Sequence, residues 1–352
     1  LSPDEAHAFS RYARVLLDAR PDIGTDIGAA LHSGWTAATM QTFIARQLEM
    51  DKEPGCALRQ LRQRVMLTLI ERDLRGVASL GEVCTTMTAL AEVSIQSALQ
   101  LLTPELERSL GVPCSASGER QELIVVGMGK LGGGELNVSS DVDLVFAYPE
   151  DGETVGAEGG RNVSNHEFFI ALGKRLIAML AARTEDGFVF RVDMRLRPWG
   201  DSGPLAMSFD ALEHYLVAQG REWERYAWIK GRFLTGSAEA KQTLAALVRP
   251  FVFRKYLDYG AFGAMRELHA QIREEVERRE LAGNVKLGPG GIREIEFIAQ
   301  VFQLIRGGRE SELQIRPTLE VLALLGQRRL LGALDVKALN KAYDFLRRVE
   351  HR

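Results

Sequence analysis

The chain has 352 residues, 26% of them charged and 46% hydrophobic, with a formal net charge of −3, and this length predicts two or three subdomains. It has no apolar run of membrane-spanning length and no signal-peptide pattern, which predicts a soluble, cytoplasmic protein with no membrane partner. The near-balanced charge argues against nucleic acid as a partner, because such a footprint ordinarily needs a basic face. The three cysteines, Cys56, Cys84 and Cys114, lack paired ligand spacing and are interpreted as reduced thiols outside any site.

Residues 1–118 are predicted to form an N-terminal helical subdomain. Apolar residues recur there at helical spacing, as at Leu58, Leu61, Val65 and Leu69. The stretch 111–118 is rich in small and turn-forming residues, which predicts a linker. A catalytic domain with a helical extension is expected to follow over 119–306.

A glycine-rich turn that leads into two aspartates is the most informative feature of the sequence. Residues 123–126 are predicted to form a short buried strand, and residues 142–146 a second one. Side chains two positions apart on a strand share a face, so Asp141 and Asp143 are expected to project side by side. Two close carboxylates repel each other unless a cation lies between them. Magnesium, which binds carboxylates together with substrate phosphate oxygens, is the expected ion.

The same turn allows other interpretations. Gly127, Gly129 and Gly132 have the spacing of a dinucleotide-binding turn, and Glu150 lies at a suitable distance for a ribose contact. Too few residues separate Gly132 from the next strand for the crossover that parallel strands require, which disfavours this hypothesis. A P-loop is excluded because no Gly-Lys-Ser/Thr follows. A plain hairpin with solvated aspartates stays open.

A helix and a third acid follow. Ser164 and Glu167 have capping-box spacing, which predicts that a helix begins there. The run 188–198 has the pattern of a strand that carries Asp193, and three carboxylates on adjacent strands can hold two metal ions about 4 Å apart. By alternation along this strand, three arginines are expected on the same face, where their guanidinium groups could bind phosphate. They are Arg191, Arg195 and Arg197.

The last third of the chain is predicted to be helical. Residues 264–281 are amphipathic, and the glycine turn 288–291 leads into an apolar helix over 292–305. Arg293 and Lys286 could contact nucleotide phosphate or form structural ion pairs, and the roles of Glu294 and Glu296 stay open. Leu1 stands where a start methionine would, and the helical pattern is unfinished at Arg352. A fragment is therefore expected, in which 307–352 begins a truncated C-terminal helical subdomain.

The order of these motifs resembles the nucleotidyltransferase superfamily typified by polymerase beta. Lys130 departs from the family pattern, in which serine is usual. Longer runs are similar to the bacterial bifunctional glutamine synthetase adenylyltransferase/adenylyl-removing enzymes over roughly residues 120–352: GMGKLGGGELNVSSDVDL, VDMRLRPWGDSGPLAMSF, GREWERYAWIKGR and KLGPGGIREIEFIAQVFQLIRGGRE. Within them, NVSS and RPWGDSGP resemble the amino-terminal, adenylyl-removing half. The superfamily pattern falls on Gly129, Gly134, Ser140, Asp141 and Asp143.

This resemblance implies a predominantly helical α+β fold, in which a mixed nucleotidyltransferase sheet is flanked by helical subdomains. It implies deadenylylation of glutamine synthetase: phosphate attacks an O-adenylyl tyrosine and gives ADP and free tyrosine, in control of nitrogen assimilation. Adenylylated glutamine synthetase, phosphate and ADP are the implied partners, with the regulatory P-II protein in the full-length enzyme. The alternative is adenylyl transfer from ATP to a tyrosine or another hydroxyl, and the intact acid triad argues against a non-catalytic binding module.

The resemblance also implies roles for individual residues. Asp141, Asp143 and Asp193 are the expected catalytic residues and ligands of two Mg²⁺ ions. The expected contacts to nucleotide and phosphate are Gly129, Lys130, Gly134, Ser140, Arg195 and Arg197.

Overall fold

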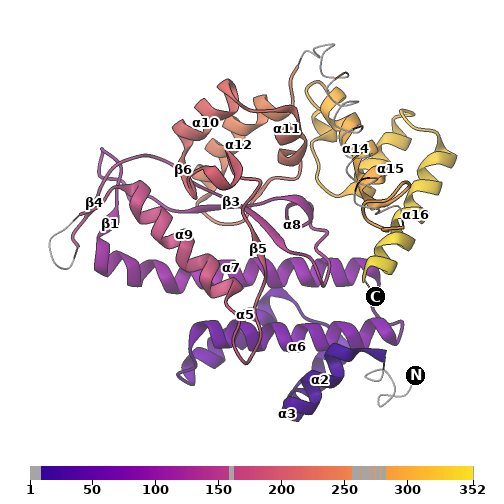
Figure 1. Cartoon of the computed structure of the whole chain (residues 1–352), viewed down its shortest axis with the longest axis horizontal. Coiled ribbons are helices and arrows are strands. Elements are labelled where there is room, and N and C mark those ends of the chain that lie inside the picture. The colour runs from indigo at the N-terminus through magenta and orange to yellow at the C-terminus, as the bar shows by residue number, and fades with distance from the viewer. Residues whose placement is uncertain are drawn as a thin grey trace. The chain divides into compact units, whose positions relative to one another are not determined.

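The computed structural model describes residues 9–157, 162–255 and 283–351, together with the single positions 263, 270, 274 and 278. The helix expected over 264–281 lies outside the described residues apart from three of these positions. The chain divides into two compact units, each assembled from segments distant in sequence (Figure 1). Unit 1 comprises Leu1–Gln121, Glu135–Val142 and Asp151–Asp193, and unit 2 comprises Glu122–Gly134, Asp143–Glu150 and Met194–Arg352. The ranges 1–118, 119–306 and 307–352 stay predictions of domain boundaries.

Unit 1 is built around a helix that is buried on nearly all sides. This helix, α6, contributes fully buried Leu58, Leu61 and Val65 to the core. Helices α5 and α7 pack against it, and α9 packs along α7 (Figure 1). The helical periodicity of the first 110 residues is thus confirmed for the described part. The helices of this unit are α2 (Arg11–Ala19), α3 (Pro21–Asp26), α4 (Gly28–Ser33), α5 (Ala37–Glu49), α6 (Pro54–Leu74), α7 (Leu80–Leu110) and α9 (Asn165–Ala181).

The start of α9 confirms the predicted capping box. The Glu167 amide donates to the Ser164 hydroxyl over 3.2 Å, and the Ser164 amide donates to the Glu167 carboxylate over 3.1 Å. Each bond satisfies a backbone donor that the first helical turn would leave unpaired. The stretch 111–118 is more ordered than a linker, because β1 (Val112–Pro113) pairs antiparallel with β4 (Thr154–Val155). All three cysteines are free thiols.

A small mixed sheet lies mainly in unit 2. Strand β2 (Ile124–Gly127) pairs antiparallel with β3 (Val142–Tyr148) and with β7 (Arg232–Phe233), whereas β6 (Ala206–Ser208) pairs parallel with β3. Because the strands on either side of the glycine-rich turn are antiparallel, the turn is not that of a dinucleotide-binding βαβ unit. At the first residue of β3, still within unit 1, the Val142 amide donates to the Arg191 carbonyl next to β5 (Val192–Asp193).

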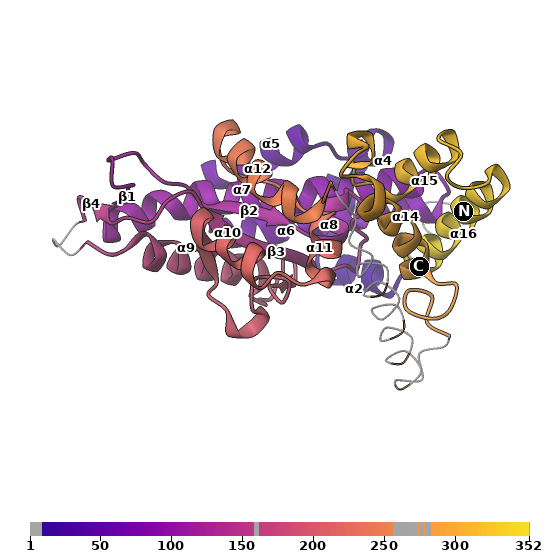
Figure 2. The ribbon, with the colours of Figure 1, turned by 90° about the horizontal axis from the view of Figure 1, so that it is seen from above.

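Two apolar cores stabilise unit 2. The first joins the sheet to α10, α11 and α12, and the second joins α14, α15 and α16, which are grouped together in both views (Figures 1 and 2). The combination of many helices with a small mixed sheet confirms the predicted α+β fold class. Within the residues that can be assessed, no helix is long and apolar enough to cross a membrane. The described helices of this unit are α8 (Gly129–Gly133), α10 (Phe209–Ala218), α11 (Glu222–Trp228), α12 (Ala238–Val252), α14 (Ile292–Arg306), α15 (Thr318–Gln327) and α16 (Ala333–His351), with 3-10 turns η2 (Gly200–Ser202) and η3 (Ser311–Leu313).

Candidate functional site

The glycine turn, residues 127–134, brings backbone directly against a predicted catalytic carboxylate. It contains the short helix α8, which begins at Gly129 with φ of +51° and is ended by Gly134 with φ of +72°. A Cβ on Gly129 would lie 2.7 Å from Asp143 Oδ2, whereas a Cβ on Gly134 would meet open space. Glycine is therefore required at both positions by the backbone, but only at Gly129 by the proximity of Asp143.

The glycine turn is held in place by residues from β7 and the segment before it. Arg232 donates to the carbonyls of Leu131 over 2.8 Å and Gly132 over 3.0 Å. Gly132 in turn lies so close to the Lys230 carbonyl that no side chain fits there. Arg232 was not among the site residues predicted from the sequence. It is the last residue of the run GREWERYAWIKGR, which resembles the family and could have drawn attention to it.

Lys130, a predicted phosphate contact, is bound to a carboxylate from α16. Its Nζ lies 2.5 and 2.7 Å from the two carboxylate oxygens of Glu350, and the two side chains are only 12% and 14% exposed. Arg347 Nε lies 3.4 Å from the same carboxylate, and Lys286 is close enough to influence both members of the pair. We call these four residues the Lys130 cluster.

The Lys130 cluster carries more positive than negative charge. Burial, followed by the charge of Arg347, lowers the pKa of Lys130 below its usual value despite the bond to Glu350. For Glu350, burial alone would raise the pKa, but the surrounding cations outweigh burial and hold the pKa below its usual value. Within these four residues three cations surround one carboxylate, and a net positive charge favours binding of an anion.

The aspartate turn, residues 137–141, belongs to unit 1 and is organised differently. Arg191 donates to the Asp141 carboxylate and, over 2.7 Å, to the Ser139 carbonyl. The Asp141 and Arg191 side chains are 44% and 52% exposed. The Asn137 amide donates to the Ser140 hydroxyl over 3.2 Å, so Ser140 helps to close this turn. An exposed ion pair, rather than buried backbone, orients Asp141.

The predicted strand around Asp193 is shorter than expected. Only Val192–Asp193 is strand, and the chain then enters a turn in which Trp199 has φ of +58°. Alternation ends with the strand, so the prediction that Arg191, Arg195 and Arg197 share one face is wrong. Arg195 is exposed in this turn. Arg197 donates to the Met194 carbonyl over 2.8 Å and therefore stabilises the turn itself.

The three predicted acids are divided between the two units. Asp141 and Asp193 belong to unit 1, and Asp143 belongs to unit 2. Across the described ranges, no three His, Cys, Asp or Glu side chains are gathered in a way that could hold a metal ion. The shared metal site and the catalytic roles therefore stay predictions.

Two acids near the start of α14 have different kinds of partner, one local and one on α16. Glu294 accepts from the Gly290 amide over 2.8 Å, and Glu296 accepts from the Tyr343 hydroxyl over 3.2 Å. Tyr343 also accepts from Arg347 over 3.0 Å, so Glu296 is connected to the Lys130 cluster.

Comparison with known proteins identifies the family. Residues 6–246 match the family model described as glutamate-ammonia ligase adenylyltransferase, and residues 266–352 match one described as PII-uridylyltransferase. Three similar relatives are bifunctional glutamine synthetase adenylyltransferase/adenylyl-removing enzymes. The relative from Aromatoleum aromaticum is 55% identical over 99% of this chain and 36% of its own length. Those from Chromobacterium violaceum and Nitrosomonas europaea are 57% and 55% identical over 98% of this chain and 38% of theirs.

The chain thus spans little more than a third of the length of these relatives. The match nevertheless covers nearly all of its own residues at more than half identity, and it includes the glycine turn, the aspartate turn and the Asp193 segment. The chain belongs to the glutamate-ammonia ligase adenylyltransferase family of nucleotidyltransferases.

Proposed function

We propose that this chain removes adenylyl groups from glutamine synthetase by phosphorolysis. The names of the relatives include both an adding and a removing activity. The direction proposed here rests on the runs NVSS and RPWGDSGP, which resemble the removing half of such enzymes. The related alternative is adenylyl transfer from ATP to a tyrosine or another hydroxyl.

One observation carries the proposal for nucleotidyl chemistry. The Asp143 carboxylate lies against the backbone of Gly129, and the next residue, Lys130, belongs to a cluster with surplus positive charge. Phosphate groups are commonly bound where backbone of a glycine-rich turn, cations and metal-ligating carboxylates converge.

The reaction makes modest demands on acid–base catalysis. A phosphate oxygen attacks the adenylyl phosphorus, the bond from that phosphorus to the tyrosine oxygen breaks, and the tyrosine oxygen gains a proton. The products are ADP and free tyrosine. Inorganic phosphate is already largely ionised near neutral pH, so no strong general base is needed, and tyrosine, with a pKa of about 10, is a moderate leaving group.

We assign metal binding to Asp141, Asp143 and Asp193, with two Mg²⁺ ions. Their hard carboxylate oxygens suit Mg²⁺, which would neutralise charge on the reacting phosphates. The chain itself contributes the placement of these acids: Gly129 makes room for Asp143, and Arg191 orients Asp141.

The predicted phosphate-binding residues divide into two groups. Gly134 and Ser140 shape their turns, and Arg197 is occupied by backbone carbonyls. We assign the side chains of Lys130 and the exposed Arg195 to the nucleotide and the attacking phosphate because each carries a positive charge next to a predicted metal-binding acid. The match of residues 266–352 to the PII-uridylyltransferase model supports the further proposal of regulation linked to the P-II protein.

Two incubations separate removal from addition. The chain is mixed with adenylylated glutamine synthetase, Mg²⁺ and phosphate, and ADP release is followed. In parallel, it is mixed with unmodified glutamine synthetase, Mg²⁺ and ATP labelled in the adenylyl group. Phosphate-dependent ADP release without labelling of the synthetase is expected. Label on the synthetase would establish the adding activity, and AMP in place of ADP would show attack by water.

A further inference from the structure

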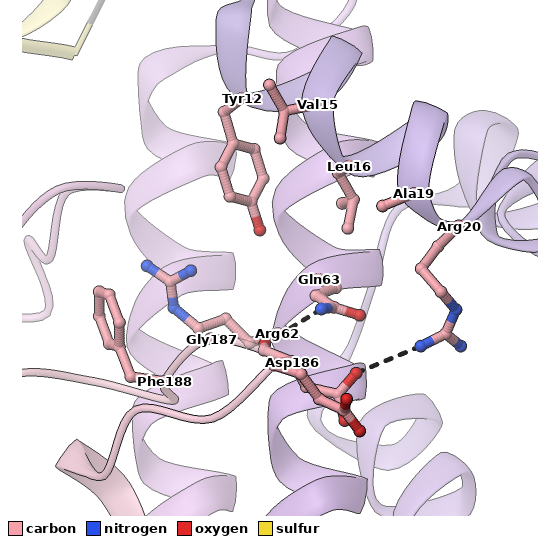
Figure 3. A pocket seen from close by; sticks show the side chains of 11 residues that line it. Tyr12, Val15, Leu16, Ala19, Arg20, Arg62, Gln63, Asp186, Gly187 and Phe188 are labelled. Atoms are coloured by element: carbon pink, nitrogen blue, oxygen red, sulfur yellow. Dashed lines mark hydrogen bonds and ion pairs between the residues drawn. The ribbon is translucent and has the colours of Figure 1, made fainter.

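Unit 1 contains a pocket of about 540 Å³, within the range typical of small-molecule sites (Figure 3). Helix α2 contributes an apolar wall that includes Tyr12, Val15 and Leu16, and α6 contributes Arg62 and Gln63 on the facing side. Tyr12 and Val15 are 38% and 61% exposed although both are large and hydrophobic. An apolar wall that is left open to solvent gains stability when a ligand covers it.

Arg62 supplies a positive charge that no described residue neutralises. Its guanidinium carbon lies 4.8 Å from the centre of the Phe188 ring and 5.8 Å from that of Phe190, so aromatic rings rather than carboxylates surround it. Its Nε is buried without a hydrogen-bond partner among the described residues. Burial lowers the pKa of Arg62, the Tyr12 hydroxyl partly offsets this, and the charge of Arg191 lowers it further. A partly buried cation of this kind is stabilised by an anionic partner.

Of the other charged residues that line the pocket, Arg20 and Asp186 pair with each other, and Glu185 is exposed. The Asp186 carboxylate accepts from Arg20 over 3.2 Å and from the Cys56 thiol over 3.2 Å. Gln63, which is 8% exposed, donates to the Asp186 carbonyl over 3.0 Å, while its own Oε1 has no partner among the described residues. The buried atoms left without a partner among the described residues of this pocket are thus Nε of the cation Arg62 and Oε1 of Gln63, beside an apolar wall.

We propose that this pocket binds a small organic carboxylate, whose carboxylate group pairs with Arg62 and whose apolar body covers Tyr12, Val15 and Leu16. The planar guanidinium matches a carboxylate through two parallel hydrogen bonds. Inorganic phosphate could satisfy the charge but not the apolar wall. A neutral apolar molecule could cover the wall but would leave Arg62 without an anion.

The full chain is titrated by calorimetry with benzoate, phenylacetate and hexanoate as probes, and with the corresponding neutral amides. At least one acid is expected to bind with a Kd below about 1 mM and more tightly than its amide. Replacing Arg62 by Met keeps the length of the side chain and removes its charge. This substitution should weaken binding of that acid by about tenfold to a hundredfold, which corresponds to the usual contribution of a hydrogen bond to a charged group.

A matched control is Arg183→Met, because Arg183 also lies over Phe188, at 5.5 Å, but does not line the pocket. It should leave the affinity nearly unchanged. If Arg62→Met does not fold, Val15→Trp on the opposite wall should abolish binding by filling the pocket. Failure of all three acids to bind would overturn the proposal. So would equal binding of an amide or of inorganic phosphate, or unchanged affinity in Arg62→Met or in Val15→Trp.

Discussion

The glycine turn and the aspartate turn hold their predicted catalytic carboxylates by opposite means. Asp143 lies against the backbone of Gly129, in a turn whose carbonyls are bound by Arg232. Asp141 is 44% exposed, and an ion pair with Arg191 orients it. Close packing of a carboxylate against backbone does not depend on the salt concentration, whereas an exposed ion pair is weak and is screened by salt. The first turn is therefore expected to be rigid and the second adjustable.

The largest expected effects come from the acids themselves. Asp143→Asn and Asp141→Asn should each lower phosphorolysis by orders of magnitude, because the amide keeps the shape of the side chain but removes the negative charge that binds metal. The unfolding free energy of Asp141→Asn should change by no more than about 1 kcal/mol, since only an exposed ion pair is lost. Turnover and thermal melting are measured for both variants.

The matched control for these variants is Asp201→Asn, whose carboxylate is 78% exposed and pairs with Arg197. It should retain most activity. Full activity in either Asp141→Asn or Asp143→Asn would show that the affected turn does not belong to the site, and the comparison between the turns would then have no bearing on catalysis.

Alanine at the two glycines tests whether the glycine turn is rigid. Both residues have positive φ, and alanine in such a conformation costs about 1–2 kcal/mol. Gly129→Ala additionally pushes a Cβ into the Asp143 carboxylate. A displacement of about 1 Å at a reacting group can lower the rate by about a hundredfold, so Gly129→Ala should lose far more activity than Gly134→Ala. Equal turnover in the two variants, at equal thermal stability, would mean that the glycine turn adjusts to the added Cβ and is not rigid.

Much of this arrangement could be predicted because it depends on local sequence. The capping box at Ser164 and the strands around the glycine turn follow from residues a few positions apart. The end of the strand at Asp193 is also local, because Arg197 binds the Met194 carbonyl three positions earlier and stabilises a turn, but the alternation of side chains gives no sign of this bond. A side-chain bond to nearby backbone thus overrides strand propensity here.

The partner of Lys130 was also beyond prediction from one sequence. Glu350 lies 220 positions further along the chain, and no local pattern relates the two residues. The same holds for Arg232, about a hundred positions from the carbonyls that it binds. The sequence predicts which residues carry the chemistry of the glycine turn, but it does not indicate which residues hold the turn in place.

The turn after Asp193 supplies a test of where the phosphate binds. Arg195→Ala should raise the KM for phosphate several-fold with little change in melting temperature, because Arg195 is exposed and contributes charge. Arg197→Ala should instead lower the melting temperature, because it removes the donor that binds the Met194 carbonyl. Phosphate kinetics and thermal melting of the two variants are compared. A higher KM in Arg197→Ala alone would reverse the assignment.

The smallest expected effect on activity concerns Glu350, which decides how much positive charge the glycine turn offers. Glu350→Gln should strengthen binding of phosphate a few-fold, because Lys130 and Arg347 lose their shared carboxylate. The same variant should be less stable at neutral pH, since it leaves the nearly buried Lys130 without the carboxylate that it binds. Because the pKa of Glu350 is lowered on folding, its stabilising contribution is complete above pH 4.5, the ordinary value, and is lost as the pH falls through the folded value.

The difference in unfolding free energy between the parent and Glu350→Gln, measured by urea denaturation, should therefore be largest near neutral pH and shrink well below pH 4.5. Glu310→Gln is the matched control, because Glu310 forms an exposed pair with Arg306 one helical turn away, and such pairs contribute about 0.5 kcal/mol. A difference that stays constant with pH would mean that Glu350 stabilises by packing alone. In that case the charge of Glu350 would not be coupled to the cations of the Lys130 cluster. The glycine turn would then lie against the Asp143 carboxylate without also attracting the phosphate.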